Sequence, residues 1–257
     1  MAEQAIFAPD LFRGQTALVT GGGTGIGFAI ARELGRLGAK VVLAARTLEA
    51  LEKAVARLRD QAVDAHLHPV NIRKEDEVAA LFDALEKDHG LPDILINNAG
   101  GQFESPALEI SANGFRAVID LNLNGTWHMT SAFAKRAVAK ERGGRIVNIV
   151  LVTGRGTPGM VHGGASRAGV INMTKTLARE WAPFGITVNA IAPGTIETEG
   201  LAQYDPARLE ADIARLPIKR MGSPREVALA AAYLVSPAGD YVTGTTLLVD
   251  GGEHLGA

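Results

Sequence analysis

One histidine and one arginine stand within a run of small residues, MVHGGASRAGV, at positions 160–170. Histidine ordinarily titrates near neutral pH, so His162 could donate a proton to a reacting group. The guanidinium of Arg167 keeps its charge, which makes it a good hydrogen-bond donor to a ribose or an oxyanion and a poor proton source. The structural alternatives are a histidine that opens a helix and faces solvent or a partner, and an arginine in a salt bridge at that helix start.

Two further polar residues could serve the same chemistry. Thr153 follows a strand pattern and could donate through its hydroxyl, although threonine is also common in turns. Asn122 lies inside a long helical pattern, where asparagine often marks a local break whose backbone carbonyl holds a water molecule. Together with His162 and Arg167, these two residues make up the candidate catalytic set.

A glycine-rich segment, TGGGTGIG at 20–27, follows the first strand pattern and opens the first helical pattern. Gly21, Gly25 and Gly27 are spaced i, i+4, i+6, which differs from the common G-x-G-x-x-G fingerprint. The physics is similar, because glycines let the backbone approach a pyrophosphate and a helix N-terminus presents free N–H groups to it. The segment predicts a dinucleotide site, and a glycine turn without a ligand is the alternative.

Arg46 lies at the end of the second strand pattern, and no acid precedes it there. In dinucleotide sites an acid at this place holds the 2′-hydroxyl of NAD, whereas an arginine accepts the 2′-phosphate of NADP. We therefore expect NADP(H), with a surface arginine at a helix start as the alternative. Asn71, after the third strand pattern, could contact the adenine edge. NNAG at 97–100 ends the fourth strand pattern, where sheets of this type bind ligands.

Short apolar runs alternate with longer amphipathic ones along the chain. The apolar runs predict buried parallel strands at 16–20, 40–45, 65–70, 93–97, 145–152, 186–192 and 245–249. The amphipathic runs predict helices at 25–37, 47–61, 74–89, 111–141, 162–183 and 224–235. This alternation predicts an α/β fold, a single doubly wound Rossmann-type domain over 1–257 with a seven-stranded parallel sheet flanked by helices.

The stretch 195–222 joins the sixth strand pattern to the last helical one. Connections of that length in compact domains are usually lids or binding loops, so we expect it to cover the substrate. Acidic residues nearly balance its basic ones, which favours a solvated outer face.

The composition argues against several partners and sites. The formal net charge is −2, which disfavours nucleic acid or an anionic membrane as a partner. The chain has no cysteine, which removes disulfides, thiolate nucleophiles and cysteine-bound zinc and fits a reducing cytoplasm. No apolar run approaches the roughly 18 residues of a membrane span, and the first ten residues show no signal peptide. We therefore expect a cytoplasmic protein with no metal site.

Several segments in order, TGGGTGIG, NNAG, LNLNG (121–125), RIVNI, NAIAPG and VDGG (249–252), resemble the short-chain dehydrogenase/reductase family over nearly the whole chain. The resemblance implies a nicotinamide cofactor and a homotetramer, associated through the 111–141 and 162–183 helices and the C-terminal strand with Tyr241 and Val242. It also implies the cofactor-binding residues, which are Gly21, Thr24, Gly25, Ile26, Gly27, Arg46, Asn71, Ile72, Asn98, Ala99, Gly100, Arg167, Pro193, Gly194 and Ile196.

The catalytic positions depart from the family. Its usual set is Asn, Ser, Tyr and Lys, and these positions hold Asn122, Leu151, Gly163 and Arg167 here. The segments GGQFESPALEIS and MVHGGASRAGV and the DGGE ending resemble the peroxisomal trans-2-enoyl-CoA reductase and the 2,4-dienoyl-CoA reductases. Some of those enzymes keep a tyrosine or an acid four positions after the Arg or Lys, and that position is Ile171 in this chain.

The missing phenol favours one reaction class. Ketone reduction needs a proton at oxygen close to the hydride step, whereas reduction of an enoyl thioester builds charge that fixed hydrogen-bond donors can stabilise. We expect an NADP-dependent oxidoreductase that reduces the C=C bond of an acyl thioester, such as a trans-2-enoyl-CoA or 2,4-dienoyl-CoA. The alternatives are an alcohol or ketone oxidoreductase whose proton donor is Tyr204 or His162, and an NADP-binding protein with little or no catalysis.

Overall fold

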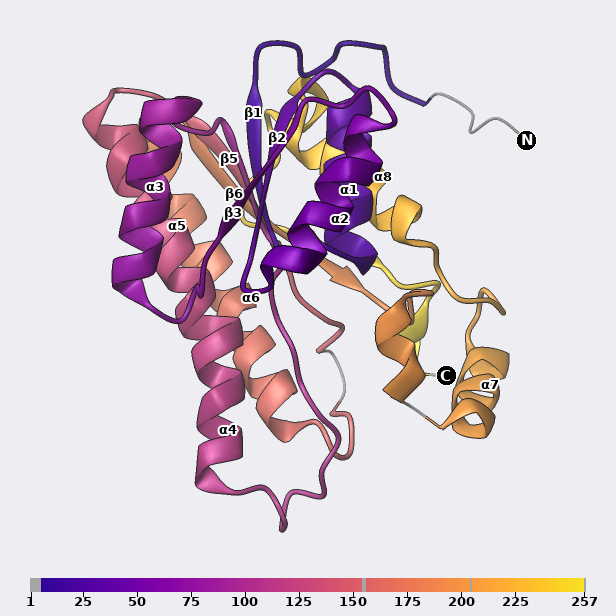
Figure 1. Cartoon of the computed structure of the whole chain (residues 1–257). Coiled ribbons are helices and arrows are strands. Elements are labelled where there is room, and N and C mark those ends of the chain that lie inside the picture. The colour runs from indigo at the N-terminus through magenta and orange to yellow at the C-terminus, as the bar shows by residue number, and fades with distance from the viewer. Residues whose placement is uncertain (1–5, 154–155, 204, 257) are drawn as a thin grey trace.

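The computed structural model describes residues 6–153, 156–203 and 205–256. Its centre is one parallel sheet with the strand order β3-β2-β1-β4-β5-β6-β7, as the alternation predicted (Figure 1). The chain winds outward from β1 to β3, returns to the other side of β1, and winds outward again to β7. The strand order therefore reverses between β1 and β4, and ligands of such sheets bind beyond the carboxyl ends of the strands at that point. The strands are β1 (Thr16–Thr20), β2 (Lys40–Ala45), β3 (Ala65–Pro69), β4 (Ile94–Asn97), β5 (Gly144–Ile149), β6 (Ile186–Pro193) and β7 (Thr246–Val249).

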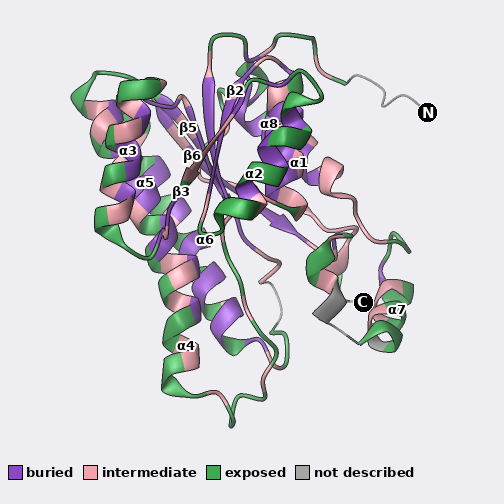
Figure 2. Cartoon of the chain, in the orientation of Figure 1, coloured by how far each residue is buried: buried purple, intermediate pink, exposed green. Residues whose placement is uncertain are grey.

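Helices cover both faces of the sheet, and each face has its own hydrophobic cluster. One cluster involves α1 (Gly25–Arg36), α2 (Leu48–Arg59) and α8 (Pro224–Val235). The other involves α3 (Glu75–Asp88), α5 (Gly125–Ala139) and α6 (Val161–Trp181). The outer faces of these helices are exposed, whereas the central strands are buried (Figure 2). This is the pattern expected of amphipathic helices packed on a sheet that is buried on both sides.

The helix expected over 111–141 is interrupted. It consists of α4 (Ala112–Ile119), a π-helical turn (Asp120–Asn124) and α5. Asn122 lies in the π turn, where its backbone carbonyl accepts a hydrogen bond from Thr126 Oγ1 at 2.7 Å. Such single π turns inside helices occur frequently at functional sites. The helix is therefore broken at Asn122, as predicted. The backbone carbonyl of Asn122 has a protein hydrogen-bond partner, the Thr126 hydroxyl.

Two other segments differ from the predicted elements. The strand expected over 145–152 ends at Ile149, and residues 150–153 continue beyond the sheet as irregular chain. Within 195–222, the chain forms a 3₁₀ turn (Glu199–Gln203) and α7 (Pro206–Arg215), whose N-cap is Asp205. Helix α7 projects away from the sheet (Figure 1). Both differences lie at the carboxyl edge of the sheet, where contacts with distant segments replace the regular pattern.

The segment before β1 is held against the sheet by Phe12. Its side chain is fully buried in the cluster with α1 and α8, and its backbone N–H donates to the Leu37 carbonyl at 2.8 Å. Complete burial of an aromatic side chain contributes several kcal/mol to a core. Among the described residues, no helix has the length and the apolar character needed to cross a membrane.

Candidate active site

Asn98 holds the glycine turn between β1 and α1 in place. Its Nδ2 donates to the carbonyls of Thr20 and Gly21, each at 3.1 Å. A Cβ atom at Gly21 would lie 2.8 Å from that nitrogen, and one at Gly27 would overlap it. Thr20 Oγ1 accepts from the N–H groups of Asn98 and Ala99, both at 3.0 Å. The two glycines are therefore required by the approach of the β4 end, and Asn98 positions the loop.

The start of α1 fits a pyrophosphate. Its N-cap, Thr24, makes no side-chain capping bond, and the first turn contains no acidic residue. The first amides of the helix are therefore free of a side-chain acceptor and can bind an anion. Gly25 has a positive φ of 54°. A Cβ atom built on Gly25 would lie within 3.6 Å of the Thr198 side chain, so the beginning of the 195–222 segment borders this turn.

Two expected adenosine contacts have different surroundings. Arg46 is exposed just after β2, and no ion pair engages it among the described residues, so its guanidinium is available for a phosphate. Asn71 has its side-chain oxygen occupied by the Arg73 N–H and Nε, at 3.3 and 3.2 Å. Ile72 is buried, and its carbonyl contacts His128 Nδ1 at 3.0 Å. In this conformation Asn71 would have to exchange partners to contact an adenine through its oxygen.

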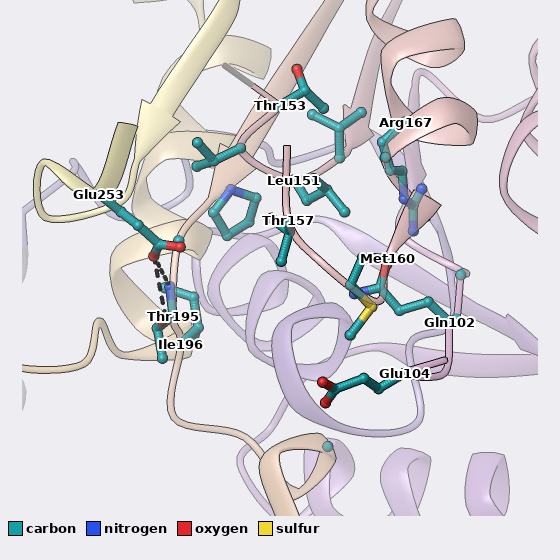
Figure 3. Close-up of a pocket in the computed structure, with 18 of the residues that line it drawn as sticks. Gln102, Glu104, Leu151, Thr153, Thr157, Met160, Arg167, Thr195, Ile196 and Glu253 are labelled. Carbon is teal, nitrogen blue, oxygen red and sulfur yellow. Dashed lines mark hydrogen bonds between the residues drawn. The ribbon is translucent and has the colours of Figure 1, made fainter. Parts of the chain in front are cut away.

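A cavity of about 1160 Å³ opens beyond the carboxyl edge of β4, β5 and β6. Its walls come from the residues after those strands, from the start of α6 and from the 195–222 segment (Figure 3). Among the expected site residues, those lining it are Ile26, Asn98, Gly100, Thr153, Arg167, Pro193, Gly194 and Ile196. The wall is largely apolar, with a few polar groups, as is usual for small-molecule sites.

Arg167 is a nearly buried cation in the cavity wall. Its side chain comes from α6, and its Nη1 donates to the Ile149 carbonyl at 2.9 Å. No carboxylate lies within 4.0 Å of it in the described part of the chain, so the expected alternative of a salt bridge is not seen. Burial lowers the pKa of Arg167 to about 10, which still leaves it charged at neutral pH. A Cβ at Gly100 would overlap Nη2, so the glycine after the β4 end makes room for the guanidinium.

Asn122 links the loop after β4 to α6. Its Oδ1 accepts from the Gly101 N–H at 2.9 Å, and its Nδ2 donates to the Gly101 carbonyl at 3.1 Å and to Ser166 Oγ at 3.0 Å. Ser166 Oγ in turn donates to the Gly163 carbonyl at 2.8 Å. Every polar atom of the Asn122 amide thus has a protein partner. The π turn that carries it therefore places the loop after β4 against the start of α6.

His162 does not face solvent, contrary to the structural alternative given above for it. Its side chain is fully buried, and its ring lies edge-on to Phe103 with 4.4 Å between ring centroids. Nδ1 accepts from the Gly163 N–H at 2.9 Å, which leaves the proton of a neutral ring on Nε2. Nε2 is buried and finds no partner in the described structure. His162 does not line the cavity, because α6 turns its ring toward the loop after β4.

Gln102 occupies the space beside Gly163. A Cβ built on Gly163 would overlap Gln102 Oε1, so any larger side chain there would require the amide to move. Gln102, Leu151 and Thr153 all line the cavity together with Arg167 (Figure 3). The wall thus presents the Gln102 amide beside Gly163, and Leu151 and Thr153 reach it from the chain after β5.

The C-terminal turn also reaches the cavity. Glu253 Oε2 accepts from the Thr195 N–H at 2.9 Å and from Thr195 Oγ1 at 3.1 Å. A Cβ at Gly194 would lie 2.7 Å from the same oxygen, and the Gly194 N–H donates to the Val249 carbonyl at 3.1 Å. Ile196 is buried and forms an isolated bridge with Gly222.

Sequence reasoning missed Gln102 and Glu253 as parts of the site. The available signal was their position, because Gln102 follows NNAG at the end of β4 and Glu253 follows VDGG at the end of β7. Tyr204, the other proton donor considered, lies outside the described residues. Among those residues, no group of three or more His, Asp or Glu side chains is arranged to hold a metal ion.

Comparisons with known proteins agree with this architecture. A family model described as enoyl-(acyl carrier protein) reductase matches residues 21–254. The peroxisomal 2,4-dienoyl-CoA reductase of Danio rerio is 40% identical over 255 residues, which cover 97% of this chain and 85% of that protein. A citronellol catabolism dehydrogenase of Pseudomonas aeruginosa PAO1 superposes with a TM-score of 0.88 at 40% identity, covering 97% of this chain and 99% of that one. An actinorhodin polyketide ketoreductase solved with NADPH superposes with a TM-score of 0.89 at 35% identity, covering 93% of this chain and 97% of that one. The chain therefore belongs to the short-chain dehydrogenase/reductase family of oxidoreductases.

Proposed function

We propose that this oxidoreductase uses NADPH to reduce activated C=C bonds of acyl thioesters, such as a trans-2-enoyl-CoA or a 2,4-dienoyl-CoA. The observation that carries the proposal is the cavity wall beside Arg167. Leu151 and Gln102 line that wall, and the Gln102 amide fills the space next to Gly163. Among the described residues lining the cavity there is no tyrosine, lysine, histidine or cysteine. In the part of the wall that the structure describes, hydrogen-bond donors are present without a phenol or an amine to protonate a carbonyl.

The cradle at the start of α1 and the exposed Arg46 support NADPH as the cofactor. The residues proposed to hold it are those around Gly21 and Gly25 for the pyrophosphate, Arg46 for the 2′-phosphate, and Arg167 for the ribose next to the nicotinamide. NADPH, when bound, supplies a hydride. The ketoreductase solved with NADPH shows that a chain of this fold can hold that cofactor.

The side chains of this protein then have a defined task. Reduction of a trans-2-enoyl thioester adds a hydride to the β-carbon and a proton to the α-carbon. Between these events, charge gathers on the thioester oxygen. The Gln102 amide and the Arg167 guanidinium are donors on the same wall, and one preorganised donor of this kind contributes roughly 10²–10³ in rate. Asn122 contributes indirectly, because it holds the loop that carries Gln102.

The proton on the α-carbon has no dedicated donor in this proposal. Arg167 remains charged because its pKa is about 10, so it orients the cofactor and the oxyanion and does not deliver a proton. His162 is enclosed behind the wall and does not border the cavity. We assign this proton to water or to the hydroxyl of Thr153. Slow protonation of carbon is tolerable once the enolate is stabilised, whereas it would not serve a ketone.

One panel of substrates tests the proposal against its alternatives. NADPH consumption is measured with crotonyl-CoA, longer trans-2-enoyl-CoAs, 2,4-dienoyl-CoAs and several ketones. We expect turnover with the unsaturated thioesters and little with the ketones. Turnover confined to ketones would instead favour a carbonyl oxidoreductase with a relocated donor such as Tyr204. Tight NADPH binding by calorimetry, with no turnover on any compound, would favour a cofactor-binding protein.

We further propose that the chain works as a homotetramer in the cytoplasm. Trp127 on α5 and Tyr241 just before the edge strand β7 are exposed large hydrophobic side chains, and their surfaces lie on the segments expected to associate. An exposed edge strand and apolar side chains are commonly covered by a partner subunit. Light scattering at micromolar concentration is expected to give four times the chain mass, and a monomer would refute this assembly. Fractionation of cells expressing the natural protein tests the location.

A further inference from the structure

The turn after β7 has a shape fixed by its own hydrogen bonds. The carboxylate of Asp250 accepts from the Gly252 N–H at 3.0 Å, from the His254 N–H at 2.8 Å and from His254 Nδ1 at 2.7 Å. Gly251 and Gly252 both adopt positive φ, at 61° and 87°. The backbone thus reverses sharply and begins a short 3₁₀ turn at Glu253. The Glu253 side chain therefore leaves a well-defined backbone.

That side chain holds the beginning of the 195–222 segment. A single oxygen, Glu253 Oε2, accepts from the backbone N–H and from the hydroxyl of Thr195 (Figure 3). The oxygen fits only because Gly194 has no side chain, since a Cβ there would lie 2.7 Å away. Hydrogen bonds to a charged acceptor are stronger than neutral ones, so this contact is well suited to fix a loop.

The same turn also holds the end of that segment. The Ile218 N–H donates to the Gly251 carbonyl at 3.0 Å, and a Cβ at Gly252 would lie 2.7 Å from the Pro217 ring. The two ends of the segment are also joined directly, because the Gly222 N–H donates to the Thr195 carbonyl at 3.0 Å. One turn therefore contacts both ends of the segment that carries α7. Leu201 and Leu209 of that segment line the cavity, so its placement shapes the cavity wall.

We propose that Glu253 is a positioning residue that fixes Thr195 and Ile196 in the cavity wall and thereby sets the conformation of residues 195–222. Glu253 needs no contact with the substrate for this role. Removing its carboxylate leaves the Thr195 N–H and hydroxyl without their acceptor, so the segment loses its anchor at one end. The effect on turnover rests on the proposed function, whereas the effect on the segment does not.

Hydrogen exchange of the full chain, without any ligand, tests the placement. In Glu253→Ala, peptides covering 195–222 are expected to exchange about tenfold faster than in the natural chain, because two bonds to a charged acceptor are lost. Glu253→Gln keeps an oxygen that can accept and should restore most of the protection. Thr195→Val removes only the hydrogen bond from the hydroxyl, so the exchange rate of the same peptides should increase less than in Glu253→Ala. Glu180→Ala, an exposed carboxylate on α6, serves as the matched control and should change nothing.

Kinetics with NADPH and an enoyl thioester test the consequence for the site. Glu253→Ala is expected to lower kcat/KM by about tenfold while the melting temperature stays within a few degrees, and Glu253→Gln should recover most of it. Unchanged exchange in 195–222, or an increase spread evenly over the whole chain, would overturn the proposal. If the natural chain reduces no thioester, the proposed function fails, and the exchange experiment still decides the role of Glu253.

Discussion

Replacing Arg167 by methionine should stabilise the fold and impair the site. The guanidinium is nearly buried, and its described contacts are one carbonyl, Ile149 O, and no carboxylate. Burial lowers its pKa well below the ordinary value of an arginine, to about 10, so the charged form costs the folded state about 3 kcal/mol at roughly 1.4 kcal/mol per pKa unit. Loss of the hydrogen bond to Ile149 offsets about 1–2 kcal/mol of this. Arg167→Met, which keeps much of the apolar stem, should therefore raise the free energy of unfolding by about 1–2 kcal/mol.

The sign of the pH dependence follows from the same shift. Because the folded chain holds this proton less tightly than the unfolded chain, the charge destabilises the fold at every pH below about 10. The penalty is released only as the pH rises above about 10. The difference in unfolding free energy between Arg167→Met and the natural chain should therefore stay constant between about pH 6 and pH 9.

Urea denaturation at fixed protein concentration measures the stability, and calorimetry measures NADPH affinity in the same preparations. We expect a higher unfolding free energy for Arg167→Met together with NADPH affinity weakened by about tenfold or more, since a charged donor is lost. Arg179→Met, an exposed arginine on the same helix, is the matched control and should change stability by less than about 0.5 kcal/mol. A stability loss above about 1 kcal/mol, or unchanged NADPH affinity, would refute the reasoning.

Four further predictions test other parts of the structure. Arg46→Ala should reduce the preference for NADPH over NADH by about tenfold or more, as one charge-assisted bond to the 2′-phosphate is lost; equal preference before and after the change, by calorimetry, would contradict the cofactor assignment. His162→Ala should lower enoyl thioester turnover by less than about tenfold, whereas a loss of roughly 10²-fold at unchanged NADPH affinity would make it the proton donor. Phe12→Ala should cost about 3–5 kcal/mol in urea denaturation, because the ring is fully buried; a cost below about 1 kcal/mol would show that the segment before β1 is not part of the core. Hydrogen bonds from Arg220 lower the pKa of Glu226 to about 2, so the stabilisation of the fold by this carboxylate is complete above about pH 4.5 and is lost as the pH falls toward 2. Glu226→Gln should therefore lower the free energy of unfolding by about 1 kcal/mol at pH 7 after solvent screening, and this difference should disappear near pH 2.

The regular elements follow from short-range pattern. The strands at 16–20 and 40–45 and the helix at 224–235 have the bounds that the alternation of apolar and amphipathic runs predicted. Each depends on neighbours within a few residues: Ser223 caps the helix before Pro224, and its capping box with Glu226 is complete. The family motifs are equally local, because a glycine turn between a strand and a helix is read from consecutive residues. Hence the sheet, its helices and the oxidoreductase family could be predicted from the chain itself.

The site required the tertiary structure, because its contacts join residues far apart in sequence. Gln102 meets Gly163 only when the ends of β4 and β5 lie side by side, and the buried ring of His162 packs edge-on against Phe103, 59 residues earlier in the chain. Glu253 and Thr195 are 58 residues apart, and no periodicity relates them. Pattern along a chain reports which face of an element is buried. The partner of a given polar atom is decided by how those elements pack, and that packing is what places an amide and a buried guanidinium in one wall of the cavity.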